Sequence, residues 1–539
     1  MTPESDDGGS QLGDAEGEGE GEAYELEERG LLREDEKEEE EEEGGGFDED
    51  EDAVDDVRRR GRRRRDSVST AASYQLYTPD EEKAVVRKFD RRLVVFVAVL
   101  YMLSFLDRSN IGNARVAGMD DDLQGDRKDS GWYEWALTAF YITYIGFEWM
   151  ALLWKIIPPH IYISVLVMTW GLTASLQAVA VNYPMLIALR ALLGIGEAGF
   201  TGVPFYLSFF FKRHELAFRT AIFISAAPLA TTFASSLAWL IMKVGQNGPI
   251  APWRLLFLVE GFPSVLIAAV AWTLIPDSPQ TASYLTPRER KVARLRLRHD
   301  HSSPKNPNPN KTKTLSPTAV LSVLADPVAW LTASIFFLTN LAYSSLPVFL
   351  PTILTAMGHS PLASQALSAP PYLASFLLLL ATAYASDASR SRSPYLIASA
   401  LLSCSGYALL ALTGSSSLLP LRLSPGHTLR YLAVYPAAVG FFNVVVLTVS
   451  WSLNNQRGAA RQGGGFALMQ VVGQCGPLVG TRLYPQSEGP YYERGMAVCA
   501  AAMGTVAVLG WGLRVYLGRL NRGLDEREGG REKGFRYML

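Results

Sequence analysis

The stretch that decides the fold is an apolar run that ends in two charges: Leu93-Val-Val-Phe-Val-Ala-Val-Leu-Tyr-Met-Leu-Ser-Phe-Leu106, then Asp107-Arg108-Ser109-Asn110-Ile111-Gly112-Asn113. The run reaches a membrane-spanning length of about 20 residues only if its helix continues through the charged pair. Each charge at membrane depth costs at least ~2.5 kcal/mol on the insertion scale. Such charges persist where they pair and face a water-filled path. Asp107 and Arg108 are therefore predicted to mark a substrate or proton site.

The composition indicates a membrane protein. The 539 residues are 48% hydrophobic and 19% charged, and long apolar stretches alternate with short polar joins from about Leu93 to Tyr516. This pattern predicts an all-α protein with several spans in the lipid bilayer. The three cysteines lack metal-ligand spacing and the six histidines are scattered. We see no nucleophile motif or nucleotide-binding loop, so we expect no enzymatic activity, no metal, no cofactor and no nucleic-acid partner.

Twelve spans are predicted in two sets of six. The first set is 92–113, 132–154, 160–181, 184–209, 218–243 and 254–276, and the second is 328–356, 366–386, 394–414, 428–451, 460–484 and 494–517. The predicted domains are a disordered acidic and Arg-rich tail (1–80), a first six-helix bundle (81–276), a central loop (277–327), a second six-helix bundle (328–517) and a C-terminal tail (518–539). Within the central loop, Lys305 to Lys313 reads as a flexible linker.

The N-terminal tail admits two interpretations. Ser67 and Ser69 follow the basic run Arg58–Arg65, so the tail could be regulated by phosphorylation. It could equally be a solvated leader whose arginines stay near anionic lipid. Nothing apolar precedes residue 93, so we expect the first span to act as the targeting signal.

The distribution of lysine and arginine among the joins predicts the orientation of the chain in the membrane. They gather before the first span, between spans 4 and 5, in the central loop and after Arg519, all on one side in a twelve-span count. The join between spans 1 and 2 is net acidic. The positive-inside rule then places both termini in the cytoplasm. We expect an integral protein of the plasma membrane that acts as a monomer.

Six plus six spans around a basic central loop resembles the layout of the major facilitator superfamily, whose two halves rock around a site near the midplane. Four stretches sharpen the resemblance: Leu106 to Ala114, Phe211 to Arg219, Trp253 to Gly261, and Ile275 to Ala282. Together they look like the anion:cation symporter family, in its fungal allantoate permease-like branch. The resemblance covers about residues 80–520.

The resemblance implies proton-coupled import of a small organic anion, such as a ureide, a vitamin (pantothenate, biotin or nicotinate) or another carboxylate. The family's Asp-Arg pair in span 1 matches Asp107 and Arg108. Its Arg and Glu seven residues apart in span 4 match Arg190 and Glu197. Glu148 and Glu260 also match family positions, and we interpret both as gate or helix-packing residues.

The residues themselves support this assignment. Arg190 and Glu197 lie almost two helical turns apart, so they share one face and are separated by roughly 10.5 Å of rise. The glycines of this span let a neighbouring helix approach closely, and span 1 is the expected neighbour. Dehydration favours a protonated carboxyl group, whereas a nearby guanidinium favours the ionised form. We predict Glu197 and Asp107 as proton sites and Arg108 and Arg190 as the groups that bind the anion.

The second half offers neutral polar groups. Asn340 and Tyr343 are predicted to orient the substrate, although they could instead bond between helices. Asp387 and Arg390, between spans 8 and 9, are predicted to gate the second half. The corresponding first-half loop, Leu153 to His160, lacks the superfamily's usual acid. That gate is therefore expected to close differently.

Three alternatives stay open. The buried charges could form a structural ion-pair network that never titrates. The chain could be a nutrient sensor that kept a transporter fold, or it could carry a neutral solute. The presence of Glu197 argues against the sensor, and the two arginines argue against the neutral solute.

Overall fold

The computed structural model describes residues 77–124, 131–245, 248–301, 322–413, 427–456, 459–528 and 536–539. The predicted tail up to residue 76 and the predicted linker Lys305 to Lys313 lie outside these residues. From Pro79 onward the chain forms one compact unit, and all its regular elements among the described residues are helices.

Two sets of helices carry the twelve predicted spans. The first set is α4 (Val95–Ala114), α6 (Trp132–Phe147) with the 3-10 turn η3 (Glu148–Lys155), α7 (Pro159–Leu176), α8 (Tyr183–Ala198) with α9 (Val203–Leu207), α10 (Arg213–Gly245) and α11 (Pro252–Leu274). The second set is α14 (Pro327–Ala356), α15 (Pro361–Ala388), α16 (Ser393–Leu412), α17 (His427–Asn454), α18 (Ala459–Gln474) with α19 (Gly476–Gly480), and α20 (Glu493–Glu528).

Nine helices in the described part of the chain are long and apolar enough to cross a membrane. The remaining predicted spans, 92–113, 132–154 and 460–484, coincide with α4, with α6 plus η3, and with α18 plus α19. The outward residues are apolar, as lipid requires: Trp511 is 62% exposed and Leu266 is 58% exposed. The predicted all-α membrane fold is confirmed.

Local sequence explains where several helices begin. Asn182 caps α8 by accepting a hydrogen bond from the Met185 amide, and Asp326 caps α14 through the Val328 amide. Both helices carry proline in the first turn, where a missing N–H costs nothing.

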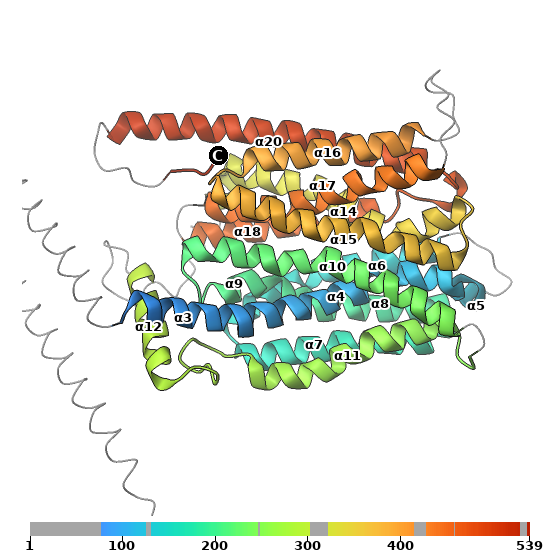
Figure 1. Cartoon of the computed structure of the whole chain (residues 1–539), viewed down its shortest axis with the longest axis horizontal. Coiled ribbons are helices and arrows are strands. Elements are labelled where there is room, and N and C mark those ends of the chain that lie inside the picture. Colours follow the sequence, from blue (N-terminus) through green and yellow to red (C-terminus); the bar gives the residue numbers. More distant parts are fainter. Residues whose placement is uncertain are drawn as a thin grey trace, which may run out of the picture. The chain divides into compact units, whose positions relative to one another are not determined.

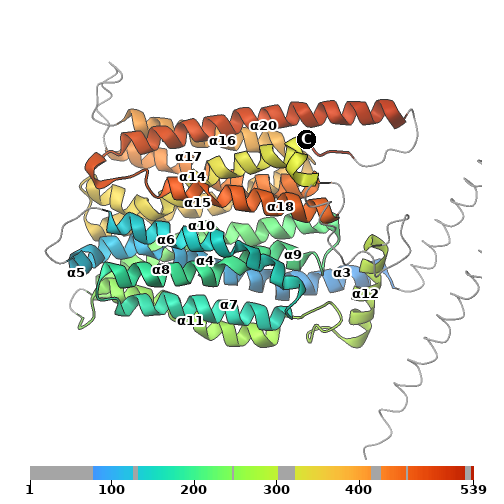
Figure 2. The same ribbon diagram turned by 180° about the vertical axis from the view of Figure 1, so that it is seen from behind.

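The helices lie roughly parallel, with two ends that we name by the elements found there (Figures 1 and 2). The α12 end carries α3 (Pro79–Phe89) and α12 (Pro287–His301), and the α5 end carries α5 (Asp120–Gln124). In the first half α7 packs on α11, and in the second half α16 packs between α17 and α20. The halves meet where α10 packs on α15 and α4 on α14.

Three details differ from expectation. The central loop contains the helix α12, and α20 continues to Glu528, past the predicted end at 517. The glycines of span 4 meet spans 2 and 3, not span 1. A Cβ at Gly194 would collide with the Phe140 carbonyl of α6, and one at Gly199 with the Tyr162 hydroxyl of α7. The prediction that these glycines admit span 1 is therefore wrong, because tight packing within the first half uses them.

Candidate functional site

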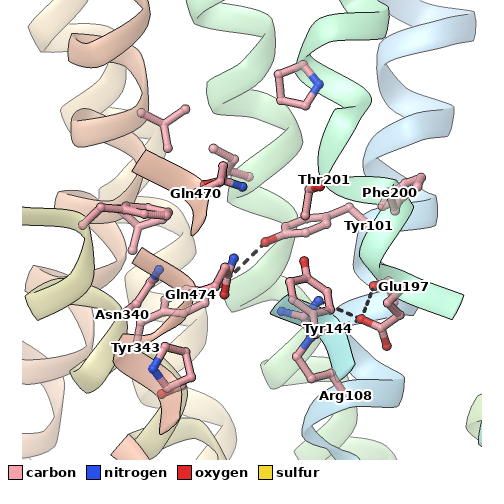
Figure 3. Close-up of a pocket in the computed structure, with 18 of the residues that line it drawn as sticks. Tyr101, Arg108, Tyr144, Glu197, Phe200, Thr201, Asn340, Tyr343, Gln470 and Gln474 are labelled. Carbon is pink, nitrogen blue, oxygen red and sulfur yellow. Dashed lines mark hydrogen bonds and ion pairs between the residues drawn. The ribbon is translucent and has the colours of Figure 1, made fainter. Parts of the chain in front are cut away.

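A cavity lies between the two halves and is lined by residues of both (Figure 3). Its first-half wall comes from α4, α6, α8, α9 and α10, and its second-half wall from α14, α17, α18 and α19. The polar side chains in the lining are Tyr101, Ser104, Arg108, Tyr141, Tyr144, Glu197, Thr201, Asn340, Tyr343, Ser344, Gln470 and Gln474. Charged residues in this wall come from the first half, and the second half contributes neutral groups.

The charged wall is an ion pair between spans 1 and 4. Arg108 Nη2 lies 2.7 Å from Glu197 Oε2, and Arg108 Nε donates to the same oxygen at 3.1 Å. The Ser104 hydroxyl donates to it as well, at 2.9 Å. The other oxygen, Oε1, is buried and has no hydrogen-bond partner among the described residues. Glu197 thus has one saturated oxygen and one free oxygen.

Two aromatic rings also contact the Arg108 guanidinium. Its Cζ lies 4.8 Å from the Tyr144 ring centre and 5.2 Å from that of Phe140. A guanidinium over an aromatic face is attracted by the ring's electron density. Because the Arg108 side chain is 12% exposed whereas Glu197 is fully buried, the arginine is the charge that presents itself to the cavity.

Asp107 and Arg190 lie behind this wall and do not line the cavity. Asp107 points toward α11 and accepts a hydrogen bond of 2.8 Å from the Ser264 hydroxyl. Arg190 Nη1 donates to the Arg108 carbonyl at 2.9 Å. The structure therefore brings Arg108 and Glu197 together and places the other two predicted charges in a layer behind them.

The neutral wall includes both predicted residues of α14. Asn340 Nδ2 donates to the Gly473 carbonyl at 3.2 Å, which ties α14 to α18. The Tyr343 hydroxyl lies 3.4 Å from the Tyr101 hydroxyl, across the boundary between the halves. Gln470 and Gln474 of α18 complete this polar surface.

Toward the α5 end the halves close over the cavity. Gly112 of α4 lies so near the Val348 carbonyl of α14 that a Cβ would have no room. Gln365 Nε2 donates to the Asn113 carbonyl at 3.3 Å. The lining continues toward the α12 end through Thr201, Pro204 and Phe466. The cavity is therefore sealed on the α5 side and extends toward the α12 end.

The predicted gate residues occupy three separate places. Glu148 and Glu260 are buried, and none of their carboxylate oxygens has a hydrogen-bond partner in the described part of the chain. Asp387 pairs with Arg392 at the α12 end, whereas Arg390 is exposed and has a left-handed backbone with φ of 50°. Their role in gating stays a prediction.

Sequence reasoning missed the aromatic and hydroxyl part of the lining. Tyr101, Ser104 and Arg108 lie at i, i+3 and i+7, which puts them on one face of α4. Tyr141 and Tyr144 share a face of α6 in the same way. This spacing was a usable signal, but tyrosine and serine are common in membrane helices and did not stand out as the charges did.

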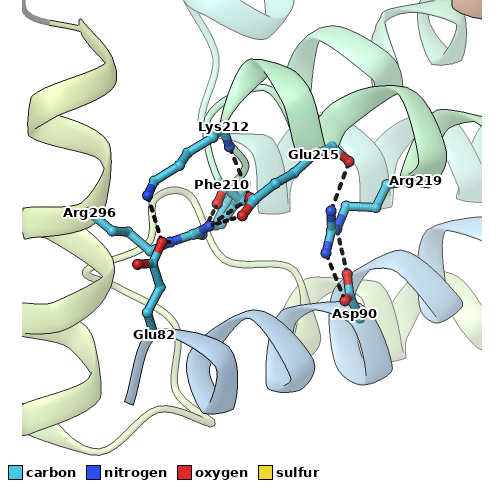
Figure 4. A network of polar contacts seen from close by, with 7 residues as sticks. All are labelled: Glu82, Asp90, Phe210, Lys212, Glu215, Arg219 and Arg296. Atoms are coloured by element: carbon cyan, nitrogen blue, oxygen red, sulfur yellow. Dashed lines mark hydrogen bonds and ion pairs between the residues drawn. The ribbon is translucent and has the colours of Figure 1, made fainter. Parts of the chain in front are cut away.

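A second set of charges lies at the α12 end and joins α3, the π-helical turn η1 (Asp90–Val94), α10 and α12 (Figure 4). Arg296 of α12 is fully buried, 3.1 Å from Glu82 of α3 and 2.6 Å from Glu215 of α10. Lys212 also binds Glu82 at 2.6 Å. Close by, Arg219 and Asp90 form two bonds of 2.6 and 2.9 Å. We call these six residues the collar network.

Known proteins resemble the chain over most of its length. "MFS transporter prlL" of a fungal species (strain NRRL 50135) is 31% identical, covering 84% of this chain and 89% of the relative. "Major facilitator-type transporter hxnP" of Emericella nidulans is 27% identical, covering 86% and 91%. Such relatives are named as transporters, so the chain is a transporter and not an enzyme.

Solved structures show the same fold. A partially occluded, inward-open structure of the xylose transporter XylE from E. coli has a TM-score of 0.57 at 12% identity, covering 79% of this chain and 99% of that one. Residues 97–481 match the Major Facilitator Superfamily. The transporter relatives and the two helical halves around a central cavity agree with this match. The chain therefore belongs to the Major Facilitator Superfamily.

Proposed function

We propose that the chain is a proton-coupled symporter of a small organic anion, in the anion:cation symporter family and its allantoate permease-like branch. The observation that carries the proposal is the ion pair of Arg108 and Glu197 in the cavity wall. Arg108 faces the cavity and can present a planar fork of donors to a carboxylate. A substrate anion would compete with Glu197 for it.

This competition couples anion and proton. When the anion takes the guanidinium, the buried Glu197 carboxylate loses its positive partner. An unpaired charge in a low-dielectric site is costly, so the carboxyl group binds a proton. Glu197 Oε1, which has no hydrogen-bond partner among the described residues, is free to carry it. Each ligand then favours the binding of the other, which is the thermodynamic form of symport.

The remaining predicted residues have supporting roles in this scheme. Asn340 and Tyr343 orient the uncharged part of the substrate. Arg190 fixes the backbone of Arg108, and Asp107 is a second proton site. The chain works as a monomer in the plasma membrane with both termini cytoplasmic. The α12 end is then the cytoplasmic end, and the cavity extends toward the cytoplasm.

The test is uptake into proteoliposomes that contain the full chain. Radiolabelled nicotinate, biotin, pantothenate and allantoate are offered with and without an imposed pH gradient, beside xylose as a neutral solute. We expect at least one anion to accumulate with the gradient and xylose not to. Accumulation of xylose alone, or of none of these by well-folded protein, contradicts the proposal.

Glu197→Gln tests the coupling. The glutamine keeps the shape and can still contact Arg108 but cannot titrate, so anion binding should survive while gradient-driven accumulation disappears. Asp80→Asn, at an exposed carboxylate of α3, is the matched control and should behave as wild type. If Glu197→Gln still accumulates the anion in response to the gradient, Glu197 is not the coupling residue.

A further inference from the structure

The last four residues of the sequence, 536–539, lie against the α12 end of the second half, outside any regular element (Figure 1). They contact the join between α15 and α16, the end of α17, and α20. We call the surface that they occupy the tail site. Its residues are Ser391, Arg392, Trp451, Asn455, Asn521 and Asp525.

Two asparagines of the tail site bind the main chain of this segment. Asn521 Nδ2 donates to the Tyr537 carbonyl at 2.9 Å, and its Oδ1 accepts from the Tyr537 amide at 2.9 Å. Asn455 binds Met538 in the same way, with distances of 3.1 and 2.7 Å. Each carboxamide therefore satisfies both main-chain groups of one residue, as the backbone of a neighbouring strand would.

The other bonds also go mainly to the main chain. The Trp451 indole donates to the Met538 carbonyl at 2.8 Å. The Leu539 main-chain oxygen accepts from the Arg392 amide and from the Ser391 hydroxyl, each at 2.8 Å. Main-chain hydrogen bonds of this kind give affinity in peptide recognition, while side-chain contacts give specificity. The tail site thus has the chemistry of a peptide-binding surface.

The contacts that hold the segment are weak enough to break. Residues 536–539 are each partly exposed. Arg536 lies 2.7 Å from Asp525, whose side chain is 54% exposed, and an ion pair this open to water contributes little. Hydrogen bonds to partly exposed groups exchange with bonds to water at small net cost. The segment can therefore leave the tail site without unfolding the bundle.

The tail site is connected to the cavity through α17. Trp451 lies in the last turn of α17 and Asn455 directly follows it, while Val445 and Val449 of the same helix line the cavity. This helix also packs on α10 of the first half. The docked segment joins the end of α17 to α20 and to the start of α16. Paired hydrogen bonds depend on orientation, so a shift of the α17 end relative to α20 would break them.

We propose that the tail site is a docking site for a peptide main chain, that residues 536–539 are its releasable occupant, and that docking favours the arrangement in which the cavity extends toward the α12 end. The bonds of the segment are satisfied in that arrangement, which is the one described above. A ligand that binds one arrangement better shifts the population toward it, and a segment of the chain does the same.

Thiol labelling of two reporter cysteines tests the proposal on purified protein whose native cysteines have been replaced. Phe466→Cys reports the cavity lining toward the α12 end, and Phe349→Cys reports the closed α5 side. Deletion of residues 536–539 should slow the first reaction and speed the second, each by at least about twofold. Opposite changes distinguish a shift of arrangement from poor folding, which would speed both reactions.

Point variants locate the effect in the tail site. Asn455→Ala and Asn521→Ala should each change both labelling rates in the same directions as the deletion. Arg514→Ala, at an exposed position of α20, is the control and should leave both rates at the reference value.

A peptide added in trans tests the docking itself. The tetrapeptide Arg-Tyr-Met-Leu, added to the deletion variant, should return both labelling rates toward those of the full chain. The same peptide methylated on the tyrosine and methionine nitrogens should not, because it cannot donate to the two asparagines.

Three results overturn the proposal. They are unchanged labelling in the deletion variant, a rise at both reporter positions that the peptide does not reverse, and equal action of the plain and methylated peptides. The proposal goes beyond the proposed function and does not depend on the solute in the cavity. Opposite labelling changes in protein that accumulates no anion leave the tail site standing and contradict symport, whereas anion uptake with unchanged labelling contradicts only the tail site.

Discussion

The collar network and the buried charges near the cavity use the same residue types in opposite ways. In the collar network each acid contacts a base, and Glu82, Glu215 and Asp90 keep between 16% and 38% of their side-chain surface exposed. Near the cavity Arg108 and Glu197 form the one close ion pair among the described residues, while Asp107, Glu148 and Glu260 are buried without such a partner.

From this difference we assign a structural role to the collar network and a functional role to the charges near the cavity. Ion pairs that are fully matched and partly hydrated hold elements together and gain little from changing protonation. Buried acids without partners cost free energy, and a protein retains them where their titration or pairing does work. The collar network thus fastens α3 and α12 to the first half, and under the proposed function the cavity charges are the part that responds to ligands.

The largest expected effect comes from removing the base on the cavity side. Arg108→Ala should lower affinity for the transported anion by about 10- to 100-fold, since hydrogen bonds to a charged group contribute about 1.5–3 kcal/mol. Thermal stability should change little, because Glu197 can bind a proton when its partner is gone. Binding of the labelled anion and the melting temperature are measured on the same preparation.

Arg108→Lys is the control for this variant. A lysine restores the charge without the planar fork, so affinity should be recovered only in part. Equal affinity in wild type and Arg108→Ala would show that the anion binds elsewhere.

The matching change in the collar network is Arg296→Ala. It leaves Glu82 and Glu215 without their shared guanidinium, which should cost about 2 kcal/mol because the arginine is fully buried but the acids are partly hydrated. The melting temperature of the purified protein should fall, while anion affinity stays at the wild-type value. A loss of affinity with unchanged stability would reverse the roles that we assign to the two regions.

Gly112→Ala tests the seal that the two halves make near the cavity. The added methyl group would meet the Val348 carbonyl, so the closed α5 end should be disfavoured. A single cysteine at exposed Ile250, introduced after masking the native cysteines, is the control and should react with a membrane-impermeant thiol reagent at the same rate in both proteins. A cysteine at buried Phe349 reports the local opening directly, and an unchanged rate there would contradict the role of this contact.

The smallest expected effect is the pH response of the collar network. Burial tends to raise the pKa of Glu82, but hydrogen bonds and charge from Lys212 and Arg296 outweigh it, so the pKa lies below its ordinary value of 4.5. A lowered pKa in the folded state means that Glu82 contributes stability above pH 4.5 and loses it as the pH falls through the folded value. Glu82 is 23% exposed, so the contribution should be well under about 1 kcal/mol.

Melting temperatures of wild type and Glu82→Gln, compared from neutral pH to below 4.5, measure this contribution. The difference between the two proteins should shrink toward zero at the acidic end. A difference that grows on acidification would show that Glu82 is not ionised in the folded protein.

Much of the architecture was predictable because it depends on local patterns. Apolar stretches long enough for a bilayer fix the spans, and helical spacing puts Tyr101, Ser104 and Arg108 on one face of α4. The ends of the helices were harder to predict. The sequence does not show that α6 ends at Phe147 in a 3-10 turn or that α20 continues to Glu528. Those ends depend on packing, such as the indole of Trp154 donating to the Gly199 carbonyl.

The sequence by itself determined that this chain spans a membrane in two sets of helices and that spans 1 and 4 carry charges at depth. Only the tertiary structure decided how those charges divide. Arg108 pairs with Glu197, Arg190 binds a backbone carbonyl, and Asp107 turns away toward Ser264 of α11. The physical reason is that periodicity fixes which residues share a face of one helix. Which face meets which neighbour is set by contacts such as those of Gly194 and Gly112, between residues far apart in the chain.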